Sequence, residues 1–258
     1  MKKFRTKKHL GQHILISQGV LEKIADELQI EPTDIIVEIG VGTGQLTEVL
    51  LNKAPKILYG IEVDKTAYPI IKERFKDYKN FILVEQDFLA LDLYQLVNHQ
   101  KIKLVGNLPY NIGALILIKT VEHKDLIKTA VFMLQKEVAQ KLIAKPKTKQ
   151  YSFLSVFVQT FFDVRYVMSV PSRFFKPPPK VVSAVVKLVP KENVPIKDIR
   201  NYQEFLTTLF TNRRKMLKSK IDTQILQKAN IKETSRVEEL TIQDFIKLYS
   251  LGKQGEKP

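Results

Sequence analysis

The sequence predicts an α/β fold with a largely parallel sheet, followed by a small α-helical domain. Between residues 34 and 135, short β-rich runs alternate with amphipathic stretches. The runs are almost continuously apolar, which is typical of parallel strands buried between two layers of helices. Residues 190–195, PKENVP, are polar and flanked by prolines, which indicates a boundary. We therefore predict one domain over residues 1–190 and a second over residues 191–258.

The predicted elements alternate along the chain. Seven strands are expected, at residues 35–39, 56–61, 81–86, 102–106, 130–135, 164–170 and 181–189. The last strand follows a proline-dense loop, and we expect it to be an antiparallel strand at the edge of the sheet. Helices are expected at residues 44–52, 65–76, 113–121 and 153–162, and in the second domain at residues 201–220 and about 223–251. Apolar residues at helical spacing, such as Phe205 and Leu209, indicate the last two.

Charge is the strongest global property of the chain. Its 258 residues carry a formal net charge of +15, with a pI near 9.7. This balance favours a polyanionic partner, most commonly nucleic acid, over the alternative of a surface that serves solubility alone. The basic residues also gather in three blocks, which favours a binding footprint. These blocks are Lys2, Lys3, Arg5, Lys7 and Lys8; Lys141, Lys145, Lys147 and Lys149; and Arg213, Arg214, Lys215, Lys218 and Lys220.

Several classes of protein are excluded by composition. The chain has no cysteine, so a disulfide framework or a zinc site with Cys ligands is not expected. Its four histidines lack metal-ligand spacing, and we predict no metal. No apolar run approaches the length of a membrane span, and no apolar segment typical of a secretory signal follows the basic N-terminus. We therefore expect a cytoplasmic protein.

A glycine-rich loop follows the first predicted strand. Residues 38–47, EIGVGTGQLT, place glycines at positions 40, 42 and 44. The dinucleotide fingerprint G-x-G-x-x-G fails, because position 45 is Gln. Glycines still allow a tight turn and a close approach of the backbone to a ligand. The alternative is a purely structural turn.

Polar residues end the next three strands: Glu62, Asp87 and Asn107. In open α/β sheets, ligands bind in the crevice beyond the carboxyl ends of the strands. Glu62 also lies about where an acid binds a ribose diol. Capping explains any one of these residues alone, but the set of three favours a binding site.

Together, this loop and these acids resemble the S-adenosyl-L-methionine-dependent methyltransferases. The resemblance implies a Rossmann-like methyltransferase sheet with Gly40, Gly42 and Gly44 packed against the methionine part of the cofactor. It implies that Glu62 holds the ribose hydroxyls and that Asp87 and Phe88 border the adenine.

The segment Asn107-Leu108-Pro109-Tyr110 then acquires a chemical interpretation. An exocyclic adenine amine is a poor nucleophile, so methylation requires its lone pair to point at the sulfonium methyl. The Asn107 side-chain oxygen and the Leu108 carbonyl can each accept one N–H, and Pro109 biases Leu108 towards an extended conformation. Tyr110 offers a ring on which a flipped base can stack. The alternative is a turn that ends the strand.

Five ordered motifs resemble the rRNA adenine N6,N6-dimethyltransferases. These are residues 7–15 (KKHLGQHIL), 107–113 (NLPYNIG), 133–142 (MLQKEVAQKL), 175–188 (FKPPPKVVSAVVKL) and 209–217 (LFTNRRKML). The resemblance implies dimethylation of two adjacent adenosines in the 3′-terminal hairpin loop of 16S rRNA, in the free RNA or a small-subunit precursor. It also implies that Phe175 forms the pocket wall opposite Tyr110. His13-Ile14 stands where many members have Asn-Phe, which leaves the role of His13 open.

The resemblance assigns residues to three roles. For catalysis they are Asn107, Leu108, Pro109, Tyr110 and Phe175. For the cofactor they are Gln12, His13, Leu15, Glu38, Gly40, Gly42, Gly44, Glu62, Val63, Asp87, Phe88 and Asn107. For RNA they are Lys7, Lys8, Lys147, Lys149, Arg213, Arg214 and Lys215.

Two alternative functions stay open. The first is a resistance methylase that acts on 23S rRNA, although the motif at residues 209–217 favours the small-subunit group. The second is a non-catalytic RNA-binding assembly or transcription factor on the same fold, although the intact glycine loop, Glu62 and residues 107–110 count against it.

Overall fold

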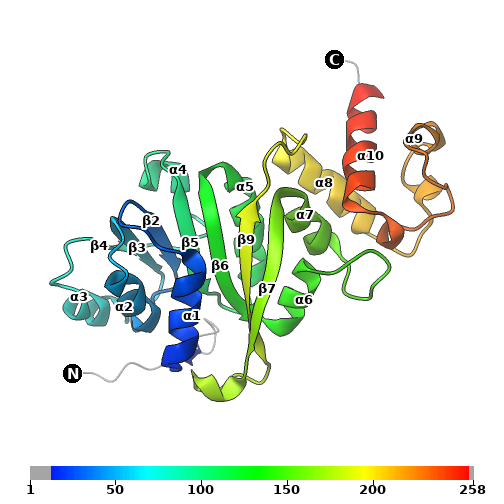
Figure 1. The fold of residues 1–258 in the computed structure, drawn as a ribbon. Coiled ribbons are helices and arrows are strands. Elements are labelled where there is room, and N and C mark those ends of the chain that lie inside the picture. The colour runs from blue at the N-terminus through cyan, green and yellow to red at the C-terminus, as the bar shows by residue number, and fades with distance from the viewer. Residues whose placement is uncertain (1–12, 256–258) are drawn as a thin grey trace. The chain divides into compact units, whose positions relative to one another are not determined.

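The computed structural model describes residues 13–255, in which a seven-stranded sheet is flanked by helices (Figure 1). The strand order is β4-β3-β2-β5-β6-β9-β7. In chain order these strands are β2 (Ile35–Ile39), β3 (Ile57–Glu62), β4 (Phe81–Glu85), β5 (Ile102–Asn107), β6 (Ile127–Gln135), β7 (Phe162–Val170) and β9 (Ser183–Pro190). Every residue of β2 is buried, in keeping with a sequence that is apolar except for Glu38. The α/β prediction is confirmed.

The pairing of the strands corrects one expectation. Strands β4, β3, β2, β5 and β6 are parallel to their neighbours, and β9 runs antiparallel to β6. However, β9 lies between β6 and β7, so the prediction of an edge strand was wrong. The prolines that suggested an edge, Pro177–Pro179, all precede β9, which keeps its N–H donors until Pro190.

Helices cover both faces of this sheet. They are α1 (Gln18–Leu28), α2 (Gln45–Asn52), α3 (Tyr68–Arg74), α4 (Leu93–Leu96) and α5 (Gly113–Glu122). Figure 1 shows α1 in front of the sheet and α5 behind it. Helix α1 buries Val20, Leu21, Ile24 and Leu28, whose spacing of three to four residues makes one apolar stripe. A second sheet pairs β1 (Ile14–Leu15) with β8 (Phe175–Lys176), which no sequence pattern had indicated.

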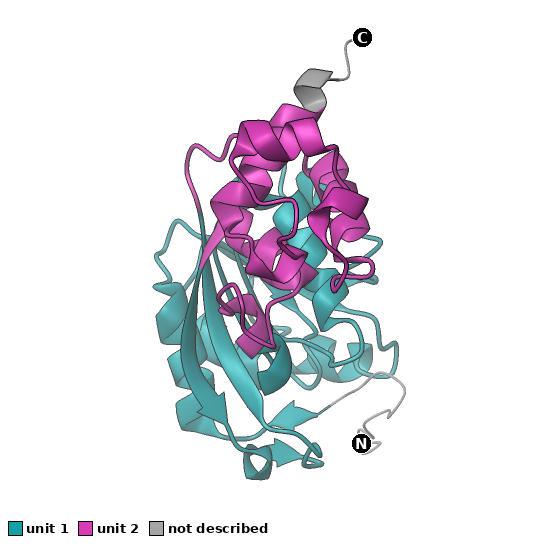
Figure 2. Ribbon diagram, turned by 90° about the vertical axis from the view of Figure 1, so that its right-hand side faces the viewer, with its two compact units in different colours: residues 1–139, 164–190 teal, residues 140–163, 191–258 magenta. Residues whose placement is uncertain are grey.

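The chain divides into two compact units (Figure 2). Unit 1 comprises residues 1–139 and 164–190, and unit 2 comprises residues 140–163 and 191–258. The division at residue 190 agrees with the proline-flanked segment. The predicted first domain had also contained residues 140–163, which the structure places in unit 2. This segment contains α7 (Phe153–Phe161), an apolar helix whose Phe161 ring contacts Tyr202 of α8 (Ile199–Phe210).

Unit 2 contains shorter helices than the sequence predicted. Helix α8 ends at Phe210, ten residues before the expected end, because Thr211 is extended (φ −63°, ψ 123°) and Asn212 is then left-handed (φ 57°). The expected helix over residues 223–251 is two helices, α9 (Thr223–Ala229) and α10 (Ile242–Gly255). Asn230, also left-handed, ends α9. The remaining helix, α6 (Lys136–Leu142), crosses the division between the units.

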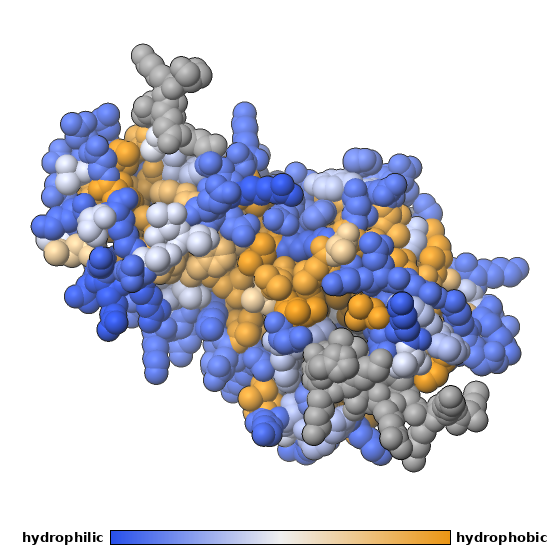
Figure 3. All heavy atoms as spheres, turned by 180° about the vertical axis from the view of Figure 1, so that it is seen from behind, coloured by the Kyte–Doolittle hydropathy of each residue, from blue (hydrophilic) through white to orange (hydrophobic). Residues whose placement is uncertain are grey.

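The surface is mixed in character. On the face in Figure 3, hydrophilic residues cover much of the surface, and apolar residues are exposed between them. The exposed large apolar side chains of the chain include Ile16, Leu115 and Val63. Of these, Val63 borders the cavity of unit 1.

Candidate active site

A cavity of about 280 Å³ lies in unit 1 at the carboxyl ends of the parallel strands. Its lining includes the glycine loop after β2 and the residues that end β3, β4 and β5. Glu62, Asp87 and Asn107, predicted from three strand ends, therefore meet in one place. Of the predicted cofactor set, the lining contains His13, Leu15, Glu38, Gly40, Gly42, Glu62, Val63, Asp87, Phe88 and Asn107.

The glycines of the loop have two different roles. All three have positive φ, at 78° for Gly40, 59° for Gly42 and 87° for Gly44. A Cβ added to Gly40 or Gly42 would meet nothing within 4 Å, whereas at Gly44 it would lie 2.5 Å from the Phe75 ring. The first two glycines thus leave open space at the cavity, and the third allows close packing of α2 against the core.

Glu62 holds this loop. One carboxylate oxygen accepts the Gly42 N–H at 2.7 Å, and the other accepts the N–H groups of Val63 and Asp64 at 3.0 and 2.8 Å. Glu62 is only 4% exposed, so these hydrogen bonds offset the free-energy cost of burying its charge.

A second buried carboxyl, that of Glu38, lies in the same cavity. It accepts a hydrogen bond from the Thr47 hydroxyl at 2.7 Å and its residue is 1% exposed. Burial, opposed by the Thr47 hydrogen bond and reinforced by the nearby charge of Glu62, raises the pKa of Glu38 from 4.5 to about 8. Glu38 therefore binds its proton far more tightly than an exposed carboxyl does.

Residues 86–88 and Val63 also line the cavity. Asp87 is exposed and accepts the Leu89 N–H at 2.9 Å, while Phe88 is 3% exposed. Val63 is 50% exposed at the same cavity. An apolar ring and an exposed carboxylate side by side suit a flat, polar-edged ligand.

The segment 107–110 forms another part of the lining. The Asn107 amide nitrogen donates to the His13 carbonyl at 2.9 Å, so its side-chain oxygen points away from that carbonyl. Leu108 is 1% exposed, and its N–H donates to Met133 at 2.8 Å. Tyr110 forms a 2.6 Å hydroxyl contact with Ser183, and burial raises the pKa of Tyr110. The side chains of this segment are fixed without any ligand.

The structure shows the contacts of His13, whose role the sequence had left open. Its ring stacks on Tyr110 with 5.5 Å between centroids, and its Nδ1 lies 2.8 Å from the Pro177 carbonyl oxygen. His13 thereby links the N-terminal segment to the proline-rich loop and to the aromatic ring of residues 107–110.

Phe175 is placed differently from the prediction. The resemblance put it on the pocket wall opposite Tyr110, but among the described residues it does not line the cavity. It is 3% exposed and belongs to the core with Leu15, Leu21 and Val185. Its strand β8 pairs with β1, and this contact, between segments 160 residues apart, draws the ring into the core.

Other lining residues were missed in the sequence. They include Leu21 and Ile24 of α1, Thr43 and Gln45 beside the glycines, Gln86, and Asn111 with Ile112. The signal for Gln86 was its place beside Asp87 at the end of a strand. Leu21 and Ile24 gave no such signal, because their helix reads as an ordinary amphipathic helix.

The predicted RNA-binding residues fall into three groups. Lys7 and Lys8, like the cofactor residue Gln12, lie outside the described residues. Lys147, Lys149, Arg214 and Lys215 are exposed in unit 2. Arg213 is instead half-buried: it donates to the Tyr151 carbonyl at 3.2 Å and pairs with Glu238 at 3.6 Å.

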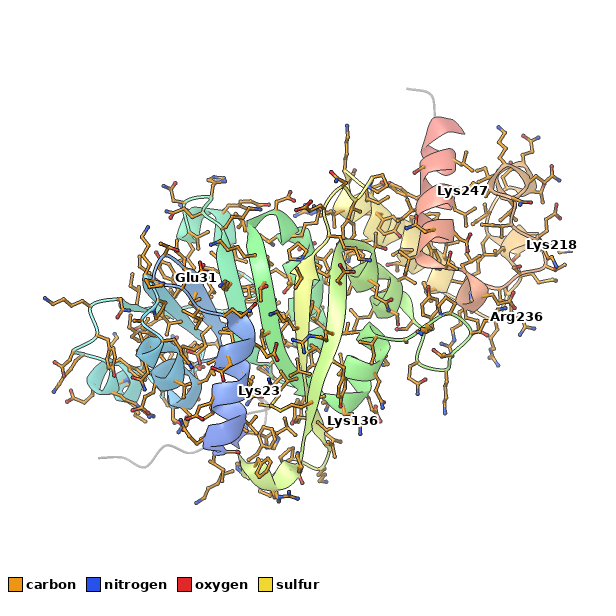
Figure 4. The ribbon with its side chains drawn as sticks, viewed as in Figure 1. Lys23, Glu31, Lys136, Lys218, Arg236 and Lys247 are labelled. Carbon is orange, nitrogen blue, oxygen red and sulfur yellow. The ribbon has the colours of Figure 1, made fainter. Side chains whose placement is uncertain are left out.

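The exposed residues of this late basic block lie on turns and on a short 3₁₀ helix, Leu217–Ser219, rather than on an α-helix. Figure 4 labels Lys218 and Arg236 in this part of unit 2. The backbones of Met216 and Arg236 form an antiparallel β-bridge, and the backbone N–H of Lys218 donates to the Glu233 carbonyl at 3.1 Å. These backbone contacts give the turns a fixed conformation with basic side chains at their surface.

The described residues contain neither a metal-binding cluster nor a membrane-spanning helix. Within residues 13–255 no group of three His, Cys, Asp or Glu side chains is placed to hold a metal ion. In the same part of the chain, no helix combines the length and apolar character needed to cross a membrane.

Together, the fold and the cavity identify the class of protein to which the chain belongs. A mostly parallel sheet with an antiparallel strand in its sixth position, a glycine loop after the first long strand and polar strand ends are features of the Rossmann-like methyltransferases.

Comparison with known proteins narrows the class to a family. The ribosomal RNA adenine dimethylase family matches residues 3–254. A protein of Persephonella marina named ribosomal RNA small subunit methyltransferase A is 59% identical, over 97% of this chain and 95% of the relative. A protein of the same name from a Sulfurihydrogenibium species is 55% identical over the full length of both. The chain belongs to the ribosomal RNA adenine dimethylase family and is an enzyme of that family.

Solved structures agree with this fold. A dimethyladenosine transferase from Plasmodium falciparum is 29% identical, with a TM-score of 0.82 over 94% of this chain and 98% of that one. The 23S rRNA methyltransferase ErmE has a TM-score of 0.71 over 92% of this chain and 98% of its own. At 24% identity, ErmE shows a shared fold alone.

Proposed function

We propose that this enzyme transfers methyl groups from S-adenosyl-L-methionine to N6 of two adjacent adenosines in the 3′-terminal hairpin loop of 16S rRNA. The observation that carries the proposal is that a single cavity contains both the glycine loop and residues 107–110. The names of the relatives from Persephonella and Sulfurihydrogenibium support small-subunit rRNA as the substrate.

The residues of the cavity fit this cofactor. Gly40 and Gly42 leave open space where side chains would otherwise stand, and Phe88 offers an apolar ring. We assign Gly40 and Gly42 to the methionine part, Glu62 to the ribose hydroxyls, and Asp87 with Phe88 to the adenine. When bound, the cofactor supplies an electrophilic methyl group on a sulfonium.

Residues 107–110 orient the target amine. We assign the Asn107 side-chain oxygen and the Leu108 carbonyl as acceptors for the two N–H groups of adenine N6. The His13 carbonyl supports this assignment, because it engages the Asn107 nitrogen and leaves the oxygen facing the other way. Tyr110 supplies the stacking surface for the flipped base. No strong base is needed, since alkylation itself makes the nitrogen acidic.

Basic residues of both units bind the RNA in this proposal. We assign phosphate contacts to Lys7 and Lys8 in unit 1 and to Lys147, Lys149, Arg214 and Lys215 in unit 2. Unit 2 then serves as the RNA-recognition domain. The enzyme acts in the cytoplasm, on free 16S rRNA or on a small-subunit precursor.

Labelled cofactor tests the proposal. Incubation with precursors of each ribosomal subunit should place the label in 16S rRNA and leave 23S rRNA unlabelled. Label in 23S rRNA would indicate the resistance-type activity instead. An absence of label in either RNA, with RNA binding intact, would indicate a non-catalytic binding factor.

A further inference from the structure

Lys119 is a buried lysine that the proposed reaction does not use. It lies in α5, the helix that begins directly after residues 107–112, and it is 8% exposed. Lysine is seldom buried to this degree without a specific partner, because desolvation of its ammonium is costly.

The partners of Lys119 all belong to the segment that contains the predicted adenine-bordering residues. Its Nζ donates to the carbonyl oxygens of Leu89 and Leu91, at 2.9 and 2.5 Å. The same atom lies 5.3 Å from the centroid of the Phe88 ring, within the range of a cation–π contact. One ammonium therefore contacts the Phe88 ring and the backbone on its C-terminal side.

The segment is also restrained by the burial of Phe88 and Leu91 and by its own hydrogen bonds. The Asp87 side chain accepts the Leu89 N–H at 2.9 Å, and the carbonyls of Asp87 and Phe88 accept the N–H groups of Ala90 and Leu91 at 3.1 and 3.3 Å. These are bonds within the segment itself. Lys119 adds bonds from a neighbouring helix, and so fixes the position of residues 87–91 relative to α5.

The electrostatic surroundings of Lys119 are acidic. Burial lowers the pKa of Lys119, and the carboxylates of Glu122, Asp87 and Asp92 act in the opposite direction. The carbonyl oxygens and the ring face likewise favour the charged form. An apolar side chain of equal length would fill this space without the desolvation cost, so packing alone does not explain a lysine here.

We propose that Lys119 is a positioning residue for the cofactor, which holds residues 87–91 so that Asp87 and Phe88 border the adenine end of the cavity. This inference rests on the proposed function. It predicts an effect on cofactor affinity that is separate from the methyl-transfer step and from RNA binding.

The variant Lys119→Met tests this role, because methionine keeps the length and apolar stem but has no donor. We expect its affinity for S-adenosylhomocysteine, measured by calorimetry, to fall at least about tenfold, which corresponds to about 1.4 kcal/mol. The KM for the cofactor should rise by a similar factor, while kcat at saturating cofactor and the Kd for RNA stay within about threefold of wild type.

Lys103→Met is the matched control. Lys103 is 9% exposed in the same unit, donates to the Gln29 carbonyl at 2.6 Å and pairs with the buried Asp34 at 2.6 Å, and neither partner lines the cavity. We expect this variant to lose stability and to keep its affinity for S-adenosylhomocysteine. If Lys119→Met does not fold, Lys119→Gln, which keeps an amide donor, should show a smaller loss of affinity in the same direction.

The outcomes are distinct. Wild-type affinity in Lys119→Met, or in Lys119→Gln if that variant alone folds, would overturn the role of Lys119 and leave the proposed function standing. An equal loss of affinity in Lys103→Met would reduce Lys119 to a general structural residue and also overturn it. A wild-type protein that does not bind S-adenosylhomocysteine would overturn the proposed function, and this inference with it.

Discussion

At the scale of single residues, Glu62 combines two tasks. The sequence predicted a carboxylate that binds ribose hydroxyls, and the structure adds three backbone N–H groups that it accepts, one of them from Gly42. A carboxylate has about four lone-pair sites, so a ribose diol bound to Glu62 would share its two oxygens with these three N–H groups. Glu62 thus ties the shape of the glycine loop to the ribose subsite.

Glu62→Ala should weaken cofactor affinity by about 100-fold or more, because hydrogen bonds to a charged group contribute roughly 1.5–3 kcal/mol each. RNA binding should survive, since it draws on basic residues elsewhere. Calorimetry with S-adenosylhomocysteine and filter binding with RNA measure the two effects. The control is Glu85→Ala, which removes an acid at the end of β4 that pairs with Lys72 instead. Unaltered cofactor affinity would remove Glu62 from the site, and a parallel loss of RNA binding would indicate misfolding.

Glu38 gives the enzyme a pH-dependent stability. Its folded-state pKa of about 8 lies above its usual 4.5, so the native state binds more protons than the unfolded state between these values. The free energy of unfolding of the free enzyme should therefore fall as pH rises from about 4.5 to about 8.

Glu38→Gln should remove this part of the pH dependence, since a neutral amide keeps an oxygen for the Thr47 hydroxyl. Urea unfolding at pH 5, 6.5 and 8 measures the difference from wild type. The exposed Glu31, labelled in Figure 4, provides a control variant, Glu31→Gln, which should follow wild type. Parallel curves for wild type and Glu38→Gln would contradict the raised pKa.

At the scale of elements, the strands were predicted closely and the turns were not. The sequence run of residues 35–39 coincides with β2, because a buried parallel strand is mostly apolar and this one is followed directly by a glycine. The early end of α8 depends on the extended conformation of Thr211 and the left-handed one of Asn212, which a helical apolar pattern does not reveal. The basic residues after Phe210 therefore extend from a turn, and Arg213 differs from its neighbours because it is half-buried and donates to the Tyr151 carbonyl.

The variant Arg214→Gln/Lys215→Gln should flatten the salt dependence of RNA binding. Each lost phosphate contact reduces the slope by about 0.7–0.9, so two lost contacts give about 1.4–1.8. Binding titrations between low and moderate salt measure this slope. Lys79→Gln/Lys101→Gln removes the same charge from exposed, isolated lysines of unit 1 and should leave the slope unchanged. Equal slopes for the two double variants would mean that Arg214 and Lys215 are only a solvated surface.

At the scale of the whole molecule, features set by local sequence patterns could be predicted, and features set by contacts between segments far apart in the sequence could not. The cavity could be predicted, because parallel strands bring their carboxyl ends together whatever their order along the sheet. The insertion of β9 between β6 and β7 and the burial of Phe175 could not, since both result from pairings between segments far apart in the chain. Residues 140–163 join unit 2 for the same reason, through contacts of α7 with α8.

The central claim is that Asn107 orients adenine N6 in 16S rRNA, and Asn107→Ala tests it most directly. The readout is mass spectrometry of the 3′-terminal fragment of 16S rRNA after incubation of small-subunit precursors with enzyme and labelled cofactor. The control is Asn80→Ala, which removes another amide that donates to a backbone carbonyl, that of Pro55, at 2.8 Å.

Wild type and Asn80→Ala should both yield N6,N6-dimethyladenosine at two adjacent positions. In Asn107→Ala the initial rate should fall by at least ~100-fold, the scale of losing one well-placed transition-state hydrogen bond. Near-normal dimethylation by Asn107→Ala, or no dimethyladenosine in 16S rRNA with the wild-type enzyme, would contradict the account.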